Sequence, residues 1–79
     1  MHYAYILQSE TSKTYHFGST TNIIERIKTH NQGGSAYTSK HIPWKLIWYS
    51  AFLTKEKAEA FEKYLKTGSG YAFSRKRFI

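Results

Sequence analysis

The stretch "YAYILQSETSKTYHFGST", residues 3–20, contains two short runs of apolar and aromatic residues separated by a polar segment. Short runs rich in Tyr, Phe and Ile are typical of β-strands. The intervening "SETSK", residues 9–13, is typical of a turn. We therefore predict a β-hairpin over residues 3–19.

The register of this hairpin decides which side chains face one another. If the turn is centred on residues 10–11, Tyr5 lies directly across from His16, and Tyr3 lies across from Gly18. Directly opposed side chains have Cβ atoms about 5 Å apart, so the phenol and the imidazole would share one face of the sheet. A slip of one residue would separate them, because alternate residues point to opposite faces.

The next segment predicts a helix with a recognisable start and end. Residues 20–30, "TTNIIERIKTH", contain Asn22 as a candidate N-cap and Glu25 three residues later, as in a capping box. The glycines at 33–34 end this helix, since glycine commonly terminates helices. Its expected apolar stripe consists of Ile23, Ile24 and Ile27.

The second half of the chain predicts a strand followed by helix. Residues 35–43 are typical of a loop, and residues 44–52, "WKLIWYSAF", form the longest β-type run, which indicates a central or well-buried strand. A helix then runs from a Thr54 cap to a stop at Gly68, and residues 68–79 have room for a short final helix. The buried stripe of the main helix consists of Ala58, Phe61 and Leu65.

This order of elements, β-β-α-β-α with a possible last α, predicts the fold class. We expect an α+β protein, a small α/β sandwich in which a three-stranded antiparallel sheet is flanked by helices. Parallel doubly wound folds need more strands and crossovers than 79 residues allow. We therefore expect a single domain over residues 1–79.

The composition narrows the classes of function. The chain has twelve Lys and Arg, five acidic residues that are all Glu, no Cys, and a formal net charge of +7. Neither a disulfide nor a thiolate metal site is available, and the charge favours a polyanionic partner such as nucleic acid, an anionic membrane or an acidic protein. No segment resembles a signal peptide or approaches the roughly 20 apolar residues of a membrane span, so we expect a cytoplasmic protein with no membrane partner.

Glu62 is the most informative acidic residue. On a helical wheel it lies beside the buried stripe of the second helix, whereas Glu59 lies on the outer face. A carboxylate beside a core is usually paired with a basic group, which predicts a structural salt bridge, for example to Arg26. The other interpretation is a ligand for a divalent metal ion.

Arg26 and His30 lie four residues apart and therefore share one face of the first helix. Such a pair is commonly just solvated. Arginine is also the side chain best suited to bidentate contact with a phosphate, and histidine carries protons near neutral pH.

Taken in order, these elements resemble the GIY-YIG nuclease superfamily along nearly the whole chain. The first motif corresponds to "YAY", residues 3–5, and the second to "HFG", residues 16–18. The helix "NIIERIKTHN" is similar to the Arg-x-x-x-His element of the family, "PWKLIWY" to its third strand, and "AEAFEKYLKTGSG" to the helix that carries its metal-binding glutamate. The resemblance is to the small single-domain bacterial branch, which is similar to the N-terminal domain of an excision-repair nuclease.

The resemblance implies hydrolysis of DNA phosphodiesters with one divalent cation, Mg²⁺ or Mn²⁺, held by Glu62. Arg26 would bind the phosphate and offset the charge of the transition state. Tyr5 would orient or deprotonate the attacking water, and His30 would form hydrogen bonds within this network. The motif positions with a structural role would be Tyr3, Gly18 and Asn22.

His16 stands where the family has a tyrosine in the second motif. A tyrosine of pKa about 10 must be shifted to serve as a base, whereas a histidine of about 6.5 is already poised to do so. The change would either preserve base catalysis with a more acidic pH profile or remove a phenol that positions the water. The second outcome would leave a weak or inactive enzyme.

Two functions follow from these residues. The first is a metal-dependent DNA endonuclease of low sequence specificity or with selectivity for DNA structure, acting in repair or recombination. The alternative is a catalytically weak or inactive nucleic-acid-binding module with the same fold, and a third is a structural protein that recruits partners through its aromatic surface. A protein partner or a homodimer would supply the choice of substrate. The candidate phosphate contacts are Lys13, Lys28, Lys40, Lys45, Arg75, Lys76 and Arg77.

Overall fold

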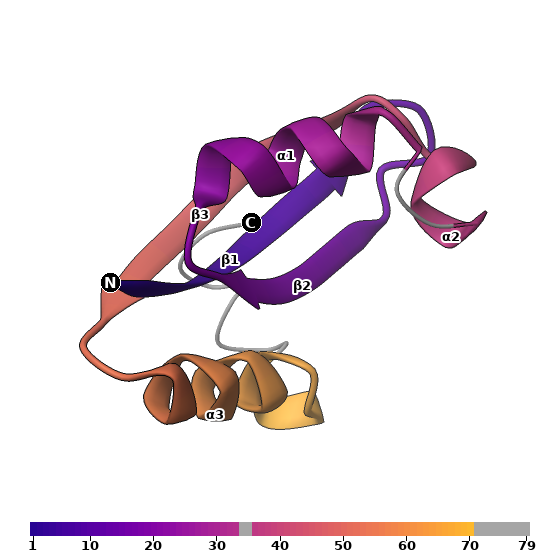
Figure 1. Cartoon of the computed structure of the whole chain (residues 1–79). Helices are drawn as coiled ribbons and strands as arrows, with labels where there is room; N and C mark the ends of the chain where they lie inside the picture. Colours follow the sequence, from indigo (N-terminus) through magenta and orange to yellow (C-terminus); the bar gives the residue numbers. More distant parts are fainter. Residues whose placement is uncertain (34–35, 71–79) are drawn as a thin grey trace.

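The computed structural model describes residues 1–33 and 36–70, which form an antiparallel sheet covered by helices. The strands are β1 (His2–Ser9), β2 (Tyr15–Thr20) and β3 (Trp44–Phe52), in the spatial order β2-β1-β3. The helices are α1 (Ile23–Asn31), α2 (Ala36–Ser39) and α3 (Lys55–Leu65). Figure 1 shows α1 and α3 on opposite sides of the sheet. The predicted α+β class is confirmed, with the described strands forming a three-stranded antiparallel sheet flanked by helices.

The hairpin of β1 and β2 has a longer turn than the sequence suggested. Ser9 N–H donates to Thr14 O at 2.9 Å, so the loop consists of the four residues 10–13. Lys13 closes it in the left-handed region, with φ of 63°. The buried Ser9 hydroxyl accepts hydrogen bonds from backbone N–H groups inside the loop, at 3.1 and 3.3 Å.

The longer loop shifts the register by two residues, so the predicted pairing is wrong. Tyr5 pairs with Gly18, and His16 pairs with Leu7. Tyr3 pairs with Thr20 instead of Gly18. Because side chains alternate with a period of two, a shift of two keeps every side chain on its predicted face. Tyr5 and His16 therefore remain on the same face, as diagonal neighbours.

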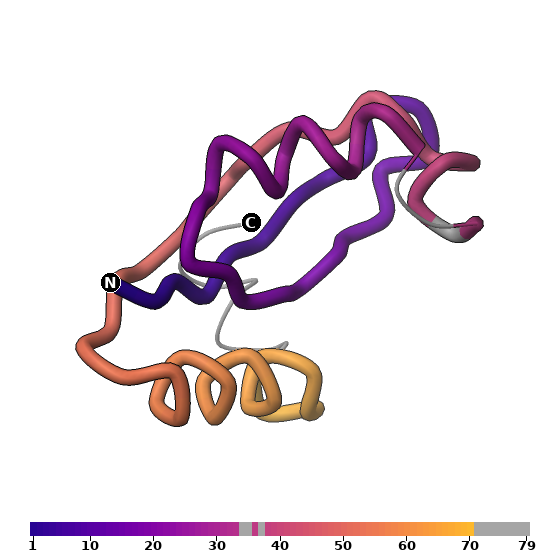
Figure 2. The backbone as a smooth tube through the Cα atoms, in the orientation of Figure 1, coloured from indigo at the N-terminus to yellow at the C-terminus, as the bar shows by residue number. Residues whose placement is uncertain are grey.

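The prediction that residues 44–52 form a central or well-buried strand is wrong, because β1 is central, β3 lies at an edge of the described sheet, and Trp44 is the one buried residue of β3. Figure 2 shows β3 returning alongside β1 before the chain enters α3. Residues 4–7 of β1 are all buried, whereas in β3 only Trp44 is buried and Lys45, Tyr49 and Ala51 are exposed. An antiparallel strand that is covered on only part of its surface exposes residues in this way. The length of an apolar run does not reveal which strand has two neighbours.

On one face of the sheet, α1 covers a core made by Tyr5, Leu7 and Trp44. Ile23 and Ile27 pack against this core because they lie four residues apart on one side of the helix. Ile24 was expected in the same stripe, but it is 70% exposed. A residue one position after Ile23 is rotated by about 100° around the helix, which turns it away from the sheet.

On the other face, α3 packs against β1 and β2. Ala58 and Leu65 are buried, and the Phe61 ring lies 5.5 Å from that of Trp48 and 5.6 Å from that of Phe52, so the predicted stripe is confirmed. No helix in the described part of the chain is long and apolar enough to cross a bilayer.

Both predicted helix caps are present, whereas two predicted boundaries are wrong. Asn22 Oδ1 accepts from Glu25 N–H at 3.1 Å, and Thr54 Oγ1 accepts from Lys57 N–H at 3.2 Å. The helix α3 ends at Leu65 instead of reaching Gly68, and the predicted loop 35–43 contains the short α2. The backbone is helical again at residues 68–70, and the remainder of the predicted last helix, 71–79, lies outside the described residues.

Candidate active site

Two side chains from β1 and α1 meet in the buried centre of the molecule. Tyr5 Oη lies 3.3 Å from His30 Nε2, and the two residues are 2% and 8% exposed. The Tyr5 ring lies over Gly18 on β2, where a Cβ would overlap the phenol hydroxyl. The glycine of the second motif therefore leaves the space that the Tyr5 hydroxyl occupies.

His16 completes a cluster of rings around this hydrogen bond. Its ring lies 4.7 Å from that of His30, 6.3 Å from Tyr5 and 5.9 Å from Trp44. Three of the four predicted catalytic residues, Tyr5, His16 and His30, are therefore neighbours. His30 Nδ1 is buried, and among the described residues it has no hydrogen-bond partner.

Trp44, which the sequence indicated only as the start of a strand, is the fourth ring of this cluster. It is 3% exposed, and its indole N–H donates to Thr38 O at 2.9 Å. The side chain of Asn31 holds its backbone at two points: Oδ1 accepts from Trp44 N–H at 2.6 Å, and Nδ2 donates to Trp44 O at 3.1 Å. These contacts join the end of α1 to the start of β3. They hold Trp44 in place beside the two histidines.

Burial sets the protonation of the cluster. It raises the pKa of Tyr5 to about 12, with Arg26 opposing and Glu62 reinforcing the change. It lowers the pKa of His16 to about 4, and the neighbouring His30 and Lys66 act in the same direction. Burial and the charge of Arg26 also lower the pKa of His30. At neutral pH the phenol is therefore protonated and both imidazoles are neutral.

Arg26 lies on α1 one turn before His30, at the surface. Its charge acts on the titration of Tyr5, His16 and His30. Among the described residues it makes no ion pair. Its guanidinium is therefore available to an anion that approaches the ring cluster from solvent.

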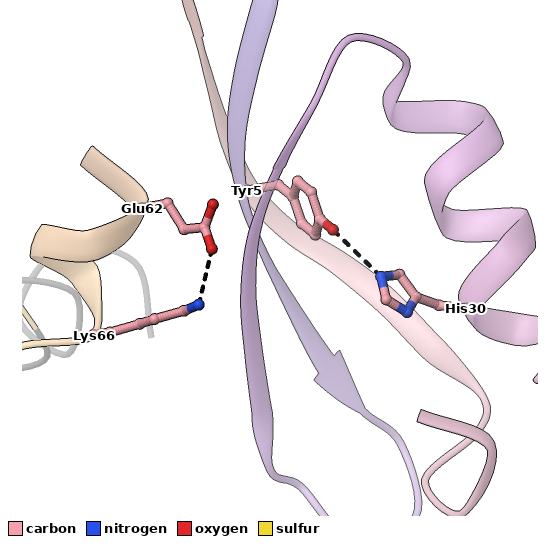
Figure 3. Close-up of polar contacts among 4 residues, drawn as sticks. All are labelled: Tyr5, His30, Glu62 and Lys66. Carbon is pink, nitrogen blue, oxygen red and sulfur yellow. Dashed lines mark hydrogen bonds and ion pairs between the residues drawn. The ribbon is translucent and has the colours of Figure 1, made fainter. Parts of the chain in front are cut away.

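Glu62 lies on α3 and is tied to its own helix. Lys66 Nζ donates to its carboxylate at 2.8 Å, one turn along α3, so the ion pair is with Lys66 and not with the Arg26 partner suggested by the sequence. Burial raises the pKa of Glu62, but hydrogen bonds from Lys66 and Ser19 outweigh it and hold the pKa below its usual value. Figure 3 shows this pair extending from α3 on one side of the strand ribbons and the Tyr5–His30 pair on the other side.

The two pairs are nevertheless electrostatically linked across β2. The Glu62 charge raises the pKa of Tyr5, and the charges of Glu62 and His16 act on one another. Ser19 on β2 forms a hydrogen bond with Glu62, and the preceding Gly18 lies against the Tyr5 hydroxyl. Two neighbouring residues of β2 therefore contact the two sides of the site.

The donor set fits a hard divalent cation held by a single protein carboxylate. No cluster of three or more His, Asp or Glu residues suited to a metal occurs in the described part of the chain. Mg²⁺ keeps several water ligands and commonly uses one or two carboxylates together with substrate phosphates. Glu62 is ionised and has a side chain 20% exposed, so it suits this role once Lys66 moves away.

The predicted phosphate contacts are dispersed over the molecule. Lys13 lies in the hairpin turn, Lys28 on α1, Lys40 after α2 and Lys45 on β3, and all four are exposed. None of them lines the groove that contains Arg26, whereas Lys55 at the start of α3 does. Lys55 was not among the contacts predicted from the sequence. The predicted contacts Arg75, Lys76 and Arg77 lie outside the described residues.

An antiparallel sheet with Tyr5 on its central strand, Arg26 and His30 on one helix and Glu62 on the other defines a small nuclease-like domain. The sequence profile of the GIY-YIG catalytic domain matches residues 1–74. The chain belongs to the GIY-YIG family, within the branch of small bacterial proteins designated UPF0213.

Alignments with proteins of this designation cover most of the chain. A UPF0213 protein of Clostridium perfringens is 40% identical over 67 residues, which span 84% of this chain and 71% of that protein. One of Bacillus licheniformis is 42% identical over 66 residues, covering 82% of this chain and 67% of that protein. The solution NMR structure of a UPF0213 protein of Bacillus halodurans is similar, with a TM-score of 0.56, 35% identity, and coverage of 94% of this chain and 79% of that one.

Proposed function

We propose that this protein is a divalent-metal-dependent endonuclease that hydrolyses phosphodiester bonds in DNA. The observation that carries the proposal is the grouping of Tyr5, His16 and His30 on one face of the sheet, electrostatically linked to Glu62 on the other face, in a chain of the GIY-YIG family. We expect low sequence specificity or selectivity for DNA structure, because base readout needs several side chains aimed at base edges. A role in repair or recombination is part of the proposal.

Arg26 is the proposed phosphate ligand. It is exposed, makes no ion pair among the described residues, and acts electrostatically on all three rings of the site. A guanidinium can donate two parallel hydrogen bonds to a phosphate, which binds the substrate and offsets charge that develops in the transition state.

Tyr5 and His16 have different proposed roles toward the attacking water. A phenol of pKa about 12 stays protonated, so we assign to Tyr5 the orientation of the water and not its deprotonation. His16, with a pKa of about 4, is neutral and keeps a nitrogen free to accept a proton. A DNA phosphate bound nearby would raise that pKa and strengthen the base. His30 would hold Tyr5 in place through the hydrogen bond at 3.3 Å.

Glu62 is the proposed ligand for Mg²⁺ or Mn²⁺. When bound, such a cation supplies Lewis-acid stabilisation of the phosphate and of the leaving oxygen. Lys66 holds the carboxylate until then and would afterwards face the negatively charged substrate.

The alternative is a nucleic-acid-binding module with little or no turnover. The 2.8 Å ion pair between Glu62 and Lys66 favours it, because a carboxylate neutralised within its own helix needs no metal. His16 at the position of the family's tyrosine favours it as well. A cytoplasmic location and a protein partner or homodimer stay predictions under both functions.

A nicking assay tests the proposal. Supercoiled plasmid and branched DNA are incubated with pure protein in Mg²⁺, in Mn²⁺ and in chelator, across a pH series. We expect metal-dependent nicking by the wild type and its loss in Glu62→Ala. Glu56→Ala, which removes an exposed carboxylate from the first turn of the same helix, serves as the matched control. Nicking of equal strength in wild type and Glu62→Ala, or none from any protein, would reject the endonuclease.

A further inference from the structure

A basic groove borders the candidate site. It has a volume of about 340 Å³ and is lined by residues that include Ser19, Thr20, Thr21, Arg26, Lys55 and Glu59. Among the described residues that line it, Glu59 supplies the one carboxylate, and Lys55 Nζ lies 3.9 Å from Glu59 Oε2. With Arg26 free of any ion pair among the described residues, the groove offers a net positive charge together with three hydroxyl groups.

An aromatic groove meets the basic one at Thr21. It has a volume of about 370 Å³ and is lined by Tyr3, Asn22, Ile23, Ile24, Leu46 and Tyr49 in addition to Thr21. Tyr49 is 53% exposed, and its ring is held edge-to-face against that of Tyr3, with centroids 5.9 Å apart. The Tyr49 ring therefore packs against Tyr3 and keeps part of its surface exposed to solvent.

We propose that the two grooves together bind one unpaired DNA nucleotide next to the phosphate held by Arg26. Its own phosphate lies in the basic groove, and its base lies against Tyr49 in the aromatic groove. This inference rests on the proposed function for its ligand, DNA, and adds the kind of DNA that fits. A charged groove that follows the backbone, joined to an aromatic platform for the base, is the arrangement by which proteins hold single strands.

An unpaired nucleotide suits these grooves better than a duplex does. In a duplex both faces of each base are covered by neighbouring bases, so an aromatic side chain reaches them only after the base is displaced. The apolar walls contributed by Ile23, Ile24 and Leu46 offer nothing to a phosphate backbone. Ile24 lies on the outside of α1 and contributes nothing to the core. In the aromatic groove it would contact the base as one of the apolar walls.

The test is a binding measurement in chelator, where no cleavage occurs. Fluorescence anisotropy is recorded with labelled single-stranded, duplex and abasic single-stranded oligonucleotides. We expect Tyr49→Leu to weaken single-strand binding about tenfold and to leave duplex and abasic binding unchanged. Lys55→Gln should weaken binding to both single strands and make it less dependent on salt. Glu59→Gln should strengthen it, because a negative charge leaves the basic groove.

The controls are matched variants outside both grooves. Tyr64→Leu removes an exposed tyrosine of α3, and Lys57→Gln removes an exposed lysine of the same helix; we expect both to bind as the wild type does. Melting curves confirm that each variant is folded. The inference is overturned if the wild type binds no single strand, if Tyr49→Leu binds as the wild type does, or if it weakens duplex and abasic binding equally.

The nicking assay separates this inference from the proposed function. Single-strand binding that depends on Tyr49 without nicking would retain the two grooves and reject the endonuclease. Nicking that is unchanged in Tyr49→Leu, together with unchanged binding, would retain the endonuclease and reject the nucleotide site.

Discussion

Tyr5 on β1 pairs directly with Gly18 on β2, and the Tyr5 hydroxyl occupies the space that a side chain at position 18 would fill. The pairing places the phenol over the backbone of the edge strand, 3.3 Å from His30. The next residue of β2, Ser19, forms a hydrogen bond with Glu62 on the other face, and the charge of Glu62 raises the pKa of Tyr5.

We predict that Gly18→Ala destabilises the protein by about 1–3 kcal/mol, because the added methyl group would overlap the Tyr5 ring in a packed site. Chemical denaturation measures this change, and nicking should fall as the phenol moves from His30. The control is Gly68→Ala, where an added Cβ meets nothing within 4 Å. If both variants unfold at the denaturant concentration of the wild type, the close approach of Tyr5 to Gly18 is not a constraint.

Local features of this fold could be predicted from the sequence, whereas the pairing of Tyr5 with Gly18 could not. Asn22 and Thr54 were recognisable as caps because each bonds to a backbone N–H three residues away. The hairpin register depends on a four-residue loop closed by Lys13 in the left-handed region, and nothing in "SETSK" marks that conformation. Glycine or asparagine would have marked it, since these residues adopt it most readily.

Some residues of the candidate site could likewise be predicted from the sequence, whereas others could not. Tyr5, His16, Arg26, His30 and Glu62 were predicted by resemblance, and the structure groups the first four on the α1 side of the sheet and Glu62 on the α3 side. Trp44 and its partner Asn31 were missed because they lie 13 residues apart and contact one another only through the tertiary fold. Lys66 was missed because the sequence interpretation paired Glu62 with Arg26 or with a metal ion, and i,i+4 spacing by itself predicts no role in a site.

We predict that Asn31→Ala costs roughly 1–3 kcal/mol, because it leaves the Trp44 N–H and carbonyl without their side-chain partner. The loss should appear in denaturation curves and as a weaker near-UV circular dichroism signal from the displaced indole. Gln32→Ala, at the exposed next position, is the control and should leave both unchanged. A native near-UV spectrum and midpoint for Asn31→Ala would show that Trp44 is held by its ring packing alone.

We predict a stability that falls in mild acid because of His16. Its pKa is about 4 in the folded protein, below the ordinary value of 6.5. Between these two values the unfolded chain binds a proton at His16 that the folded chain does not, so protonation favours unfolding as the pH drops. The stabilisation is complete above the unfolded pKa and is lost progressively toward pH 4.

His16→Phe isolates this effect, since the lowered pKa values of His30 and Glu62 act in the same direction in both proteins. We expect the melting temperature of the wild type to fall more than that of His16→Phe between about pH 7.5 and about pH 5. Parallel curves for the two proteins would mean that His16 has the same proton affinity in the folded and unfolded states. In the nicking assay the same variant should lose activity, because no nitrogen remains to accept a proton from water.

Lys66→Gln tests whether Glu62 holds the metal ion of the proposed endonuclease. Lys66 donates to the Glu62 carboxylate at 2.8 Å, and a cation that binds there has to displace it. Removing the positive charge should therefore lower the Mg²⁺ or Mn²⁺ concentration needed for half-maximal nicking, while the maximal rate stays the same or decreases. Stability should change by only about 0.3–0.5 kcal/mol, as for other exposed i,i+4 pairs. Lys57→Gln, which removes an exposed lysine of the same helix outside the basic groove, should leave the metal requirement unchanged. If Lys66→Gln leaves it unchanged too, Glu62 is not the metal ligand, and its ion pair with Lys66 has a structural role alone.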